Sequence, residues 1–181
     1  MNKKKYIIKY SIIAGIVVIC VLLDQITKIV AEANLKEYQS VEIIKGFFDF
    51  TLCYNTGGAW SILSNATWLL ALISVVALGF MIYTLIRTNS LFYMISASVF
   101  CGGLIGNLID RLFNVGVVDF LDFNIFGYDF PVFNVADTFI VISAILIAVS
   151  MILEDKKETK KVEVKEEENG KDTSGEGKER C

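Results

Sequence analysis

Four apolar segments, each long enough to cross a bilayer, constrain the fold of this chain more than any other feature. A membrane-spanning helix needs about 20 consecutive, mostly apolar residues. We place the spans at about residues 10–30, 66–86, 91–109 and 136–153, of which the second and third contain no charged residue. With 54% hydrophobic and 20% charged residues, the 181-residue chain is too apolar for an ordinary soluble domain. The sequence therefore predicts an all-α membrane protein with four transmembrane helices.

The chain divides into two parts of different composition. Residues 1–153 hold the spans and the segments between them, and residues 154–181 form a tail that is Lys/Glu-rich and then Gly/Ser-rich. A tail with so few apolar residues buries too little surface to offset the entropy lost on ordering, so we expect it to be disordered. Some helix is expected to continue through Lys165, where glutamate and lysine side chains pair along the helix.

Basic residues near the span ends predict the orientation. They lie before the first span, between the second and third, and after the fourth: Lys3, Lys4, Lys5, Lys9, Arg87, Lys156, Lys157, Lys160 and Lys161. Because cytoplasmic loops carry the excess of lysine and arginine, we expect both termini in the cytoplasm and residues 31–65 and 110–135 on the outer side. Ile19 stands where a cleavable signal peptide needs a small residue, so we interpret the first segment as an uncleaved span.

The two outer segments contain strand-like sequence. Residues 41–54 and 117–133 are rich in β-branched and aromatic residues, with Gly46 and Gly127 at the expected breaks. We therefore predict a small extracytoplasmic β-sheet at the membrane surface, where phenylalanine and tyrosine are favoured.

The residue types present narrow the chemistry. The chain has no histidine, which excludes a Ser-His-Asp triad and a histidine-ligated zinc ion. The four cysteines, Cys20, Cys53, Cys101 and Cys181, show no metal-binding spacing, and we expect no structural disulfide. The sequence has no basic stripe with interleaved aromatic residues, so we expect no nucleic-acid binding. Acid–base chemistry near neutral pH then falls to paired carboxylates.

Polar residues gather at the outer ends of the spans and between them. They are Asp24, Lys28, Asn55, Asn107, Asp110, Arg111, Asp119, Asn134 and Asp137. The predicted topology brings all of them to the same membrane face. Ionisable residues beside lipid are costly and are functional-site candidates by default. We expect this layer to hold the active site, with Asp119 and Asp137 as the acid–base pair.

Several of these residues also have a purely structural interpretation. Asp24 and Lys28 could form a local ion pair at a helix end. Asn134 could cap the fourth span, and Asp137 could favour the positive end of its helix dipole. Asp110 with Arg111 could mark a helix terminus. Separately, Gly102 and Gly106 form a GxxxG pattern, which predicts close helix packing.

Other function classes fit part of the pattern. A transporter or channel would place acidic residues at mid-bilayer depth, whereas here they lie at one face. A metal-dependent hydrolase would use Asp119, Asp137 and Asn134 as oxygen ligands for Mg²⁺. A non-catalytic scaffold would give no reason for so many polar residues in one layer. From the residues alone, peptidase and transporter rank about equally.

Five motifs, in order along the chain, resemble those of bacterial lipoprotein signal peptidase (signal peptidase II). They are Asp24-Gln-Ile-Thr-Lys28, Asn55-Thr-Gly57-Gly-Ala-Trp60, Gly106-Asn107-Leu-Ile-Asp110-Arg111, Val117-Val-Asp119-Phe120 and Phe133-Asn134-Val-Ala-Asp137. On this resemblance, residues 1–153 form a four-span membrane peptidase domain. Gly58, where alanine is more usual, and the charged tail depart from the family pattern.

The resemblance implies an aspartic endopeptidase of the bacterial cytoplasmic membrane. Such an enzyme removes the signal peptide from diacylglyceryl-modified prolipoproteins and cuts just before the lipidated cysteine. It implies Asp119 and Asp137 as catalytic residues, without a metal or cofactor, on the extracytoplasmic side. The implied supporting or substrate-binding residues are Asp24, Lys28, Asn55, Gly57, Asn107, Arg111 and Asn134. The implied partners are membrane-embedded prolipoproteins, the lipid bilayer and inhibitors of the globomycin type.

Asp122, close after Asp119, is a second carboxylate on the same predicted strand. Residues separated by an odd number of positions point to opposite faces of a strand. We therefore expect only one of the two to face Asp137, and the resemblance implies that it is Asp119.

Overall fold

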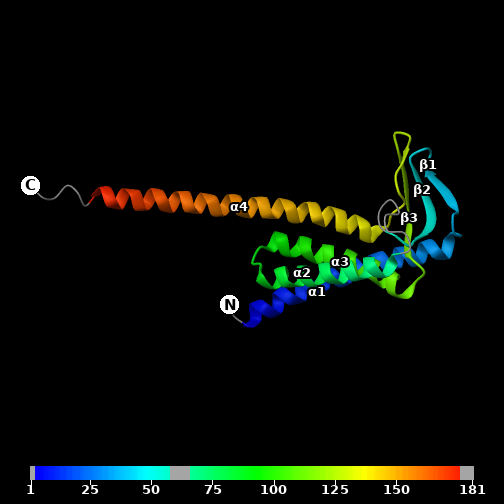
Figure 1. The fold of residues 1–181 in the computed structure, drawn as a ribbon, viewed down its shortest axis with the longest axis horizontal. Helices are drawn as coiled ribbons and strands as arrows, with labels where there is room; N and C mark the ends of the chain where they lie inside the picture. The colour runs from blue at the N-terminus through cyan, green and yellow to red at the C-terminus, as the bar shows by residue number, and fades with distance from the viewer. Residues whose placement is uncertain (1–2, 58–65, 176–181) are drawn as a thin grey trace, which may run out of the picture.

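The computed structural model describes residues 3–57 and 66–175. Within these ranges, four helices are long and apolar enough to cross a membrane. Their bounds are α1 Lys3–Asn34, α2 Thr67–Arg87, α3 Leu91–Phe113 and α4 Val135–Gly175. The four predicted spans are thereby confirmed. Figure 1 shows α1, α2 and α3 side by side, with α4 extending beyond them toward the C-terminus.

Three helices are longer than their predicted spans. Helix α1 begins at Lys3 rather than at residue 10, and α3 continues to Phe113 rather than ending at residue 109. Helix α4 continues past residue 153 to Gly175, ten residues beyond the helix expected through Lys165. Lysine and glutamate are good helix formers and pair along a helix, so hydrophobicity marks the bilayer-crossing part better than the helix ends. Disorder of the tail stays a prediction, because a charged helix without a packed apolar face is marginal in water.

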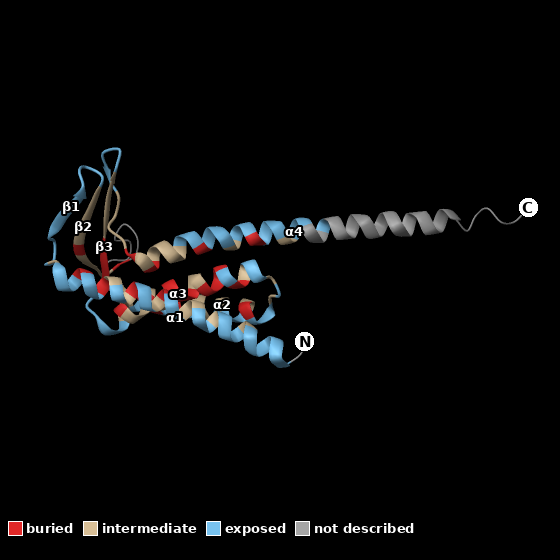
Figure 2. Ribbon diagram, turned by 180° about the vertical axis from the view of Figure 1, so that it is seen from behind, coloured by how far each residue is buried: buried red, intermediate tan, exposed pale blue. Residues whose placement is uncertain are grey.

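Helix α3 is the centre of the bundle. About 61% of its most apolar stretch is buried, against 6% for α1 and 17% each for α2 and α4. Figure 2 shows buried residues gathered along α3 and where the strands meet the helices. Many exposed side chains of the other helices are large and apolar, such as Leu22, Val76 and Ile145, as expected of surfaces that face lipid.

Glycines on α3 allow this close packing. A Cβ at Gly102 would lie 2.4 Å from Cys20 Cβ on α1, and one at Gly106 would lie 2.4 Å from an oxygen of Asp24. A Cβ at Gly103 would lie 2.6 Å from the carbonyl oxygen of Ala136 on α4. The GxxxG pattern thus packs α3 against α1, and the intervening Gly103 packs it against α4.

A four-stranded antiparallel sheet lies at the end of the bundle away from the N-terminus (Figure 1). Among the described residues, its order is β1 Ser40–Ile44, β2 Phe48–Asn55, β3 Val117–Ile125 and β4 Tyr128–Asp129. Gly46 and Gly127 occupy the two hairpin turns with φ of +67° and +84°, a region that favours glycine. The small sheet predicted from the two outer segments is therefore confirmed.

The sheet is fastened to the helices by a small apolar core. Leu52 of β2 and Val118 and Phe120 of β3 pack with Ala31 near the end of α1, and all four are buried. Backbone bonds then tie the segment before α4 to β3, since the N–H groups of Phe120 and Leu121 both donate to the Phe133 carbonyl. The start of α4 is thereby held beside β3, which brings Asn134 next to Asp119.

Candidate active site

Asp119 is a buried carboxylate on β3, with 1% of its surface exposed. Its Oδ1 accepts a hydrogen bond from Asn134 Nδ2 at 2.7 Å, and its Oδ2 accepts one from Asn55 Nδ2 at 3.1 Å. Burial, with a smaller contribution from the nearby charge of Asp137, raises the pKa of Asp119 to about 7. The two amide donors and Lys28 act in the opposite direction. A carboxyl that titrates near neutral pH is suited to acid–base work.

Asp137 lies in the first turn of α4 and is half-buried. Its Oδ1 accepts a hydrogen bond from Asn107 Nδ2 at 2.7 Å, and its Oδ2 accepts one from the Asn134 backbone N–H at 3.3 Å. The positive end of the α4 dipole also favours a negative charge at this position.

Asn134 joins the two carboxylates into one site. Its side chain donates to Asp119 and to Asn107 Oδ1, while its backbone N–H donates to Asp137. The Asn134 side-chain oxygen accepts from the Asp137 backbone N–H at 2.9 Å. A single residue therefore contacts both aspartates, which come from a strand and a helix.

Lys28, Asp24 and Asp110 form a buried ionic cluster behind Asn107. The Lys28 ammonium lies 2.9 Å from Asp24 Oδ2 and 2.7 Å from Asp110 Oδ2, and it donates to Asn107 Oδ1 at 3.0 Å. Gln25 Nε2 donates to Asp24 and to Asp110 at 3.1 and 3.2 Å. The local Asp24–Lys28 ion pair that the sequence suggested is present, and it extends to α3.

Arg111 and Gly57 hold neighbouring groups. Arg111 Nη1 donates to the Asn107 carbonyl at 3.3 Å, and its positive charge interacts with the negative charge of the Asp137 carboxylate. The Gly57 N–H donates to Asn55 Oδ1 at 2.9 Å, which turns the Asn55 amide nitrogen toward Asp119. The last three residues of this motif, 58–60, lie outside the described residues.

One member of the site, Gln25, was missed: it appears in a quoted motif but was assigned no role. Asp110 was expected in the polar layer, three residues after Asn107 on the same helix face, but no function beyond a helix terminus was assigned to it. Gln25 is adjacent to Asp24 in sequence, and nothing local indicates that its side chain turns toward α3.

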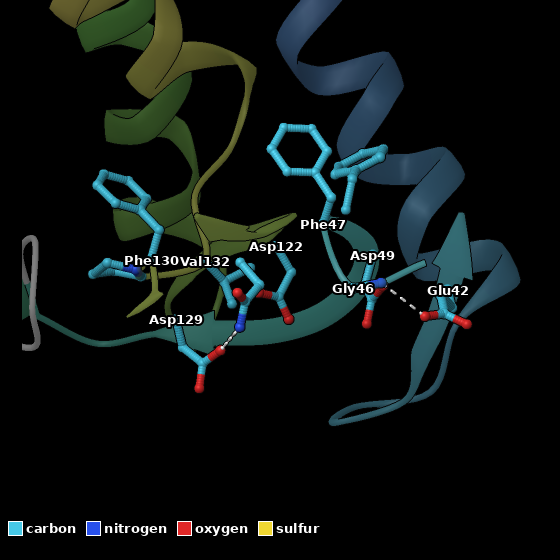
Figure 3. A pocket seen from close by; sticks show the side chains of 11 residues that line it. Glu42, Gly46, Phe47, Asp49, Asp122, Asp129, Phe130 and Val132 are labelled. Atoms are coloured by element: carbon cyan, nitrogen blue, oxygen red, sulfur yellow. Dashed lines mark hydrogen bonds between the residues drawn. The ribbon is translucent and has the colours of Figure 1, made fainter. Parts of the chain in front are cut away.

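Asp122 lies away from this cluster. Its backbone pairs with Asp49 across β2 and β3, and its side chain lines a pocket of about 590 Å³ on the sheet. Figure 3 shows Asp122, Asp49, Asp129 and Glu42 around this pocket, together with Phe47 and Phe130. The lining includes neither Asp119 nor Asp137. The alternation expected from the odd spacing thus holds in β3.

Within residues 3–57 and 66–175, no group of three or more histidine, cysteine, aspartate or glutamate side chains is arranged to hold a metal ion. The site as described offers two carboxylates, surrounded by amide donors and backed by a buried ionic cluster. Two carboxyl groups in one site are suited to acid–base chemistry, in which one is ionised and the other protonated.

The model of the family described as signal peptidase (SPase) II matches residues 16–153. That match covers most of the chain and includes every residue of the site. The chain belongs to the signal peptidase II family. The resemblance of the five motifs is thereby confirmed, and so is the expected function of the family, removal of signal peptides from prolipoproteins.

Relatives of the family agree in length and fold. Lipoprotein signal peptidases of Staphylococcus aureus strains JH9 and Newman are each 40% identical over 164 residues, covering 90% of this chain and 99% of theirs. A bacterial membrane enzyme solved at 2.3 Å is 36% identical with a TM-score of 0.75, covering 81% of this chain and 91% of that one. Another, solved at 1.9 Å, is 38% identical with a TM-score of 0.71, covering 78% and 92%. This signal peptidase II is a multi-pass membrane protein.

Proposed function

We propose that this signal peptidase is an aspartic endopeptidase in which Asp119 and Asp137 form the catalytic dyad. The observation that carries the proposal is the shared contact with Asn134, which donates to both carboxylates. Asp119 is buried, its pKa is raised to about 7, and the charge of Asp137 contributes to that rise. Two interacting carboxyl groups with one proton between them are the chemistry of aspartic peptidases.

In the proposed reaction, the ionised carboxylate takes a proton from water as the water oxygen attacks the scissile carbonyl carbon. The protonated carboxyl donates its proton to the carbonyl oxygen, which gives a tetrahedral diol. When the diol collapses, the carbon–nitrogen bond breaks and a hydroxyl proton returns to one carboxylate. The leaving amine takes the proton that came from water, and the dyad ends with the single proton with which it began.

The neighbouring amides hold the dyad in this proposal. Both amide hydrogens of Asn134 are directed at protein acceptors, Asp119 and Asn107, so we assign Asn134 to fixing the carboxylates. Asn107 has the same role for Asp137. Donors that are already oriented before substrate arrives need no reorganisation during the reaction.

We infer that the substrate is a diacylglyceryl-modified prolipoprotein, cut just before the lipidated cysteine. The apolar outer faces of the helices support lateral entry, because the signal helix and the acyl chains could then stay in lipid. The site lies at the sheet end of the bundle, opposite the lysine-rich N-terminus. The positive-inside rule then assigns both termini to the cytoplasm of a bacterial cell and the dyad to the outer side. Inhibitors of the globomycin type are expected to block cleavage.

The proposal is tested by cleavage of a lipid-modified precursor by the purified enzyme in lipid nanodiscs. Asp119→Asn and Asp137→Asn should each abolish cleavage, because neither variant can hold and transfer the dyad proton. Asp122→Asn is the matched control on the same strand, and we expect it to keep most of the activity. Excess chelator should leave cleavage unchanged, whereas a metal-dependent hydrolase would stop. Normal processing by either dyad variant would end the aspartic proposal.

A further inference from the structure

Lys28 is a fully buried lysine with 2% of its surface exposed. An ammonium group has three N–H donors and no acceptor. Among the described residues, three acceptors lie within hydrogen-bond distance: Asp24 Oδ2 at 2.9 Å, Asp110 Oδ2 at 2.7 Å and Asn107 Oδ1 at 3.0 Å. Each donor of Lys28 therefore has a partner, and the three partners come from two helices.

The two carboxylates held by Lys28 each bind a backbone N–H far away in sequence. Asp110 Oδ2 accepts from the N–H of Val118 at 3.2 Å, and Asp24 Oδ1 accepts from the N–H of Ala136 at 3.0 Å. Val118 immediately precedes Asp119, and Ala136 immediately precedes Asp137. The same ammonium is thus connected, through one carboxylate each, to the backbone beside both members of the dyad.

The third partner of Lys28 leads to the dyad through side chains. Asn107 Oδ1 accepts from Lys28 and also from Asn134 Nδ2 at 3.1 Å. Since a lysine can only donate, the oxygen of the Asn107 amide must face Lys28, and its nitrogen faces Asp137 Oδ1 at 2.7 Å.

We propose that Lys28 is a positioning residue that fixes the placement of Asp119 relative to Asp137, through Asp110 and Val118 on one side and Asp24 and Ala136 on the other. This inference rests on the proposed dyad. Lys28 does not touch the reacting atoms in this scheme, and it acts through the two carboxylates and Asn107. Aspartates that share a proton must be held within a narrow range of separations, because a misplacement of about 1 Å can cost about a hundredfold in rate.

A purely structural role is the alternative that the test must exclude. A buried ion pair adds little net stability compared with well-packed apolar residues, so stability alone is a weak reason for the cluster. The charged and titratable groups around Lys28 and the dyad are Asp24 and Asp110, which contact Lys28, Arg111 on α3, whose charge interacts with both aspartates, and Cys53, which pairs with Asp119 from β2. Changes at Lys28 therefore alter both the position and the charge around the dyad.

The first variant is Lys28→Met, with Lys36→Met as the control for loss of an exposed lysine near the same helix. We expect Lys28→Met to lower kcat by about ten- to a hundredfold, as for residues that orient a catalytic or ligating side chain without touching the substrate. KM should change by less than about twofold. At least one limb of its pH–rate profile should move by about one unit. A structural role would scale the profile by the folded fraction and leave both limbs in place, which would overturn the inference.

A second pair of variants tests the route through Asp110 if Lys28→Met does not fold. Asp110→Asn keeps an oxygen that can accept the Val118 N–H, whereas Asp110→Ala keeps none. We expect kcat of Asp110→Ala to be lower than that of Asp110→Asn by about tenfold or more, with both variants folded by thermal melting. Equal kcat in the two variants would contradict the proposed connection. Asp119→Asn and Asp137→Asn are measured alongside. Cleavage by either of these variants would refute the dyad. If neither cleaves and Lys28→Met has wild-type kcat, only the role of Lys28 is refuted.

Discussion

Asn134 and Asp137 cap the first turn of α4 reciprocally. The Asn134 side-chain oxygen accepts from the Asp137 backbone N–H at 2.9 Å, and the Asp137 carboxylate accepts from the Asn134 backbone N–H at 3.3 Å. This is the geometry of a capping box, with asparagine and aspartate in the two positions. The structural interpretations of both residues are therefore correct, and they coexist with their places in the site.

This double use ties helix formation to the placement of the dyad. A capped helix start has a fixed backbone, so the Asp137 carboxylate is directed by the same bonds that begin α4. Asn134 then reaches from the cap to Asp119 at 2.7 Å. The hydrogen bonds that begin α4 therefore also connect Asp137, through Asn134, to Asp119.

Two substitutions at Asn134 should separate these effects. Asn134→Ser keeps a good helix cap but cannot donate to both Asp119 and Asn107, so we expect a melting temperature near that of the wild type and a kcat lower by about a hundredfold. Asn134→Ala loses the cap as well and should cost about a further 1 kcal/mol of stability. The measurements are kcat on a lipidated precursor and thermal melting in the same detergent. An Asn134→Ser enzyme with full activity would show that the bridge to Asp119 is dispensable.

The pKa of Asp119 predicts a pH dependence of stability. The ordinary pKa of the carboxyl is 3.8, and in the folded protein burial raises it to about 7. Between these values the folded protein keeps a proton that the unfolded chain has lost. The contribution of Asp119 is therefore most favourable below about pH 4 and is lost as the pH rises to about 7, by a few kcal/mol at most.

The measurement is the melting temperature of wild type and Asp119→Asn between about pH 4.5 and about pH 8.5, a range that brackets the pKa of Asp119 in the folded protein. The wild type should lose more stability across this range than Asp119→Asn, which has no carboxyl to deprotonate. Asp122→Asn is the control for removing a carboxyl from the same strand, and it should follow the wild type. Parallel curves for wild type and Asp119→Asn would contradict a raised pKa at Asp119.

Sequence reasoning reached the parts of this protein that local patterns determine. Hydropathy located α1 to α4, β-branched and aromatic runs located the sheet, and odd spacing separated Asp122 from Asp119. The site residues were identified from motifs and topology, because the four-span topology places these polar residues at the same membrane face.

The connections between distant segments could not be predicted from local patterns. Asp24 binds the N–H of Ala136, 112 residues away, and no periodicity in either segment indicates that pairing. Gln25 was overlooked for the same reason, since its contact with Asp110 spans 85 residues. The end of α4 was also placed too early: the helix was expected through Lys165 and continues to Gly175, because helix propensity continues through charged residues.

Gly106 tests whether the close approach of α1 and α3 is needed for the site. A Cβ at this position would lie 2.4 Å from Asp24 Oδ2 and 3.4 Å from the Ala136 Cβ. Asp24 cannot move away easily, because its two oxygens are bound by Lys28, Gln25 and the Ala136 N–H. We therefore expect Gly106→Ala to cost about 1–3 kcal/mol of stability through overpacking. It should also lower kcat, because displacing Asp24 frees the backbone beside Asp137.

Gly79→Ala on α2 is the matched control for this substitution. A Cβ at Gly79 meets no atom within 4 Å, so this variant should keep wild-type kcat and melt at or slightly above the wild-type temperature, since alanine favours helix. Both variants add one methyl group to a glycine in a membrane-spanning helix, and they differ in whether that methyl group has room. If Gly106→Ala melted and cleaved like Gly79→Ala, the helices would have to be farther apart than the Gly106–Asp24 contact allows, and Asp24 could not hold the start of α4 as described.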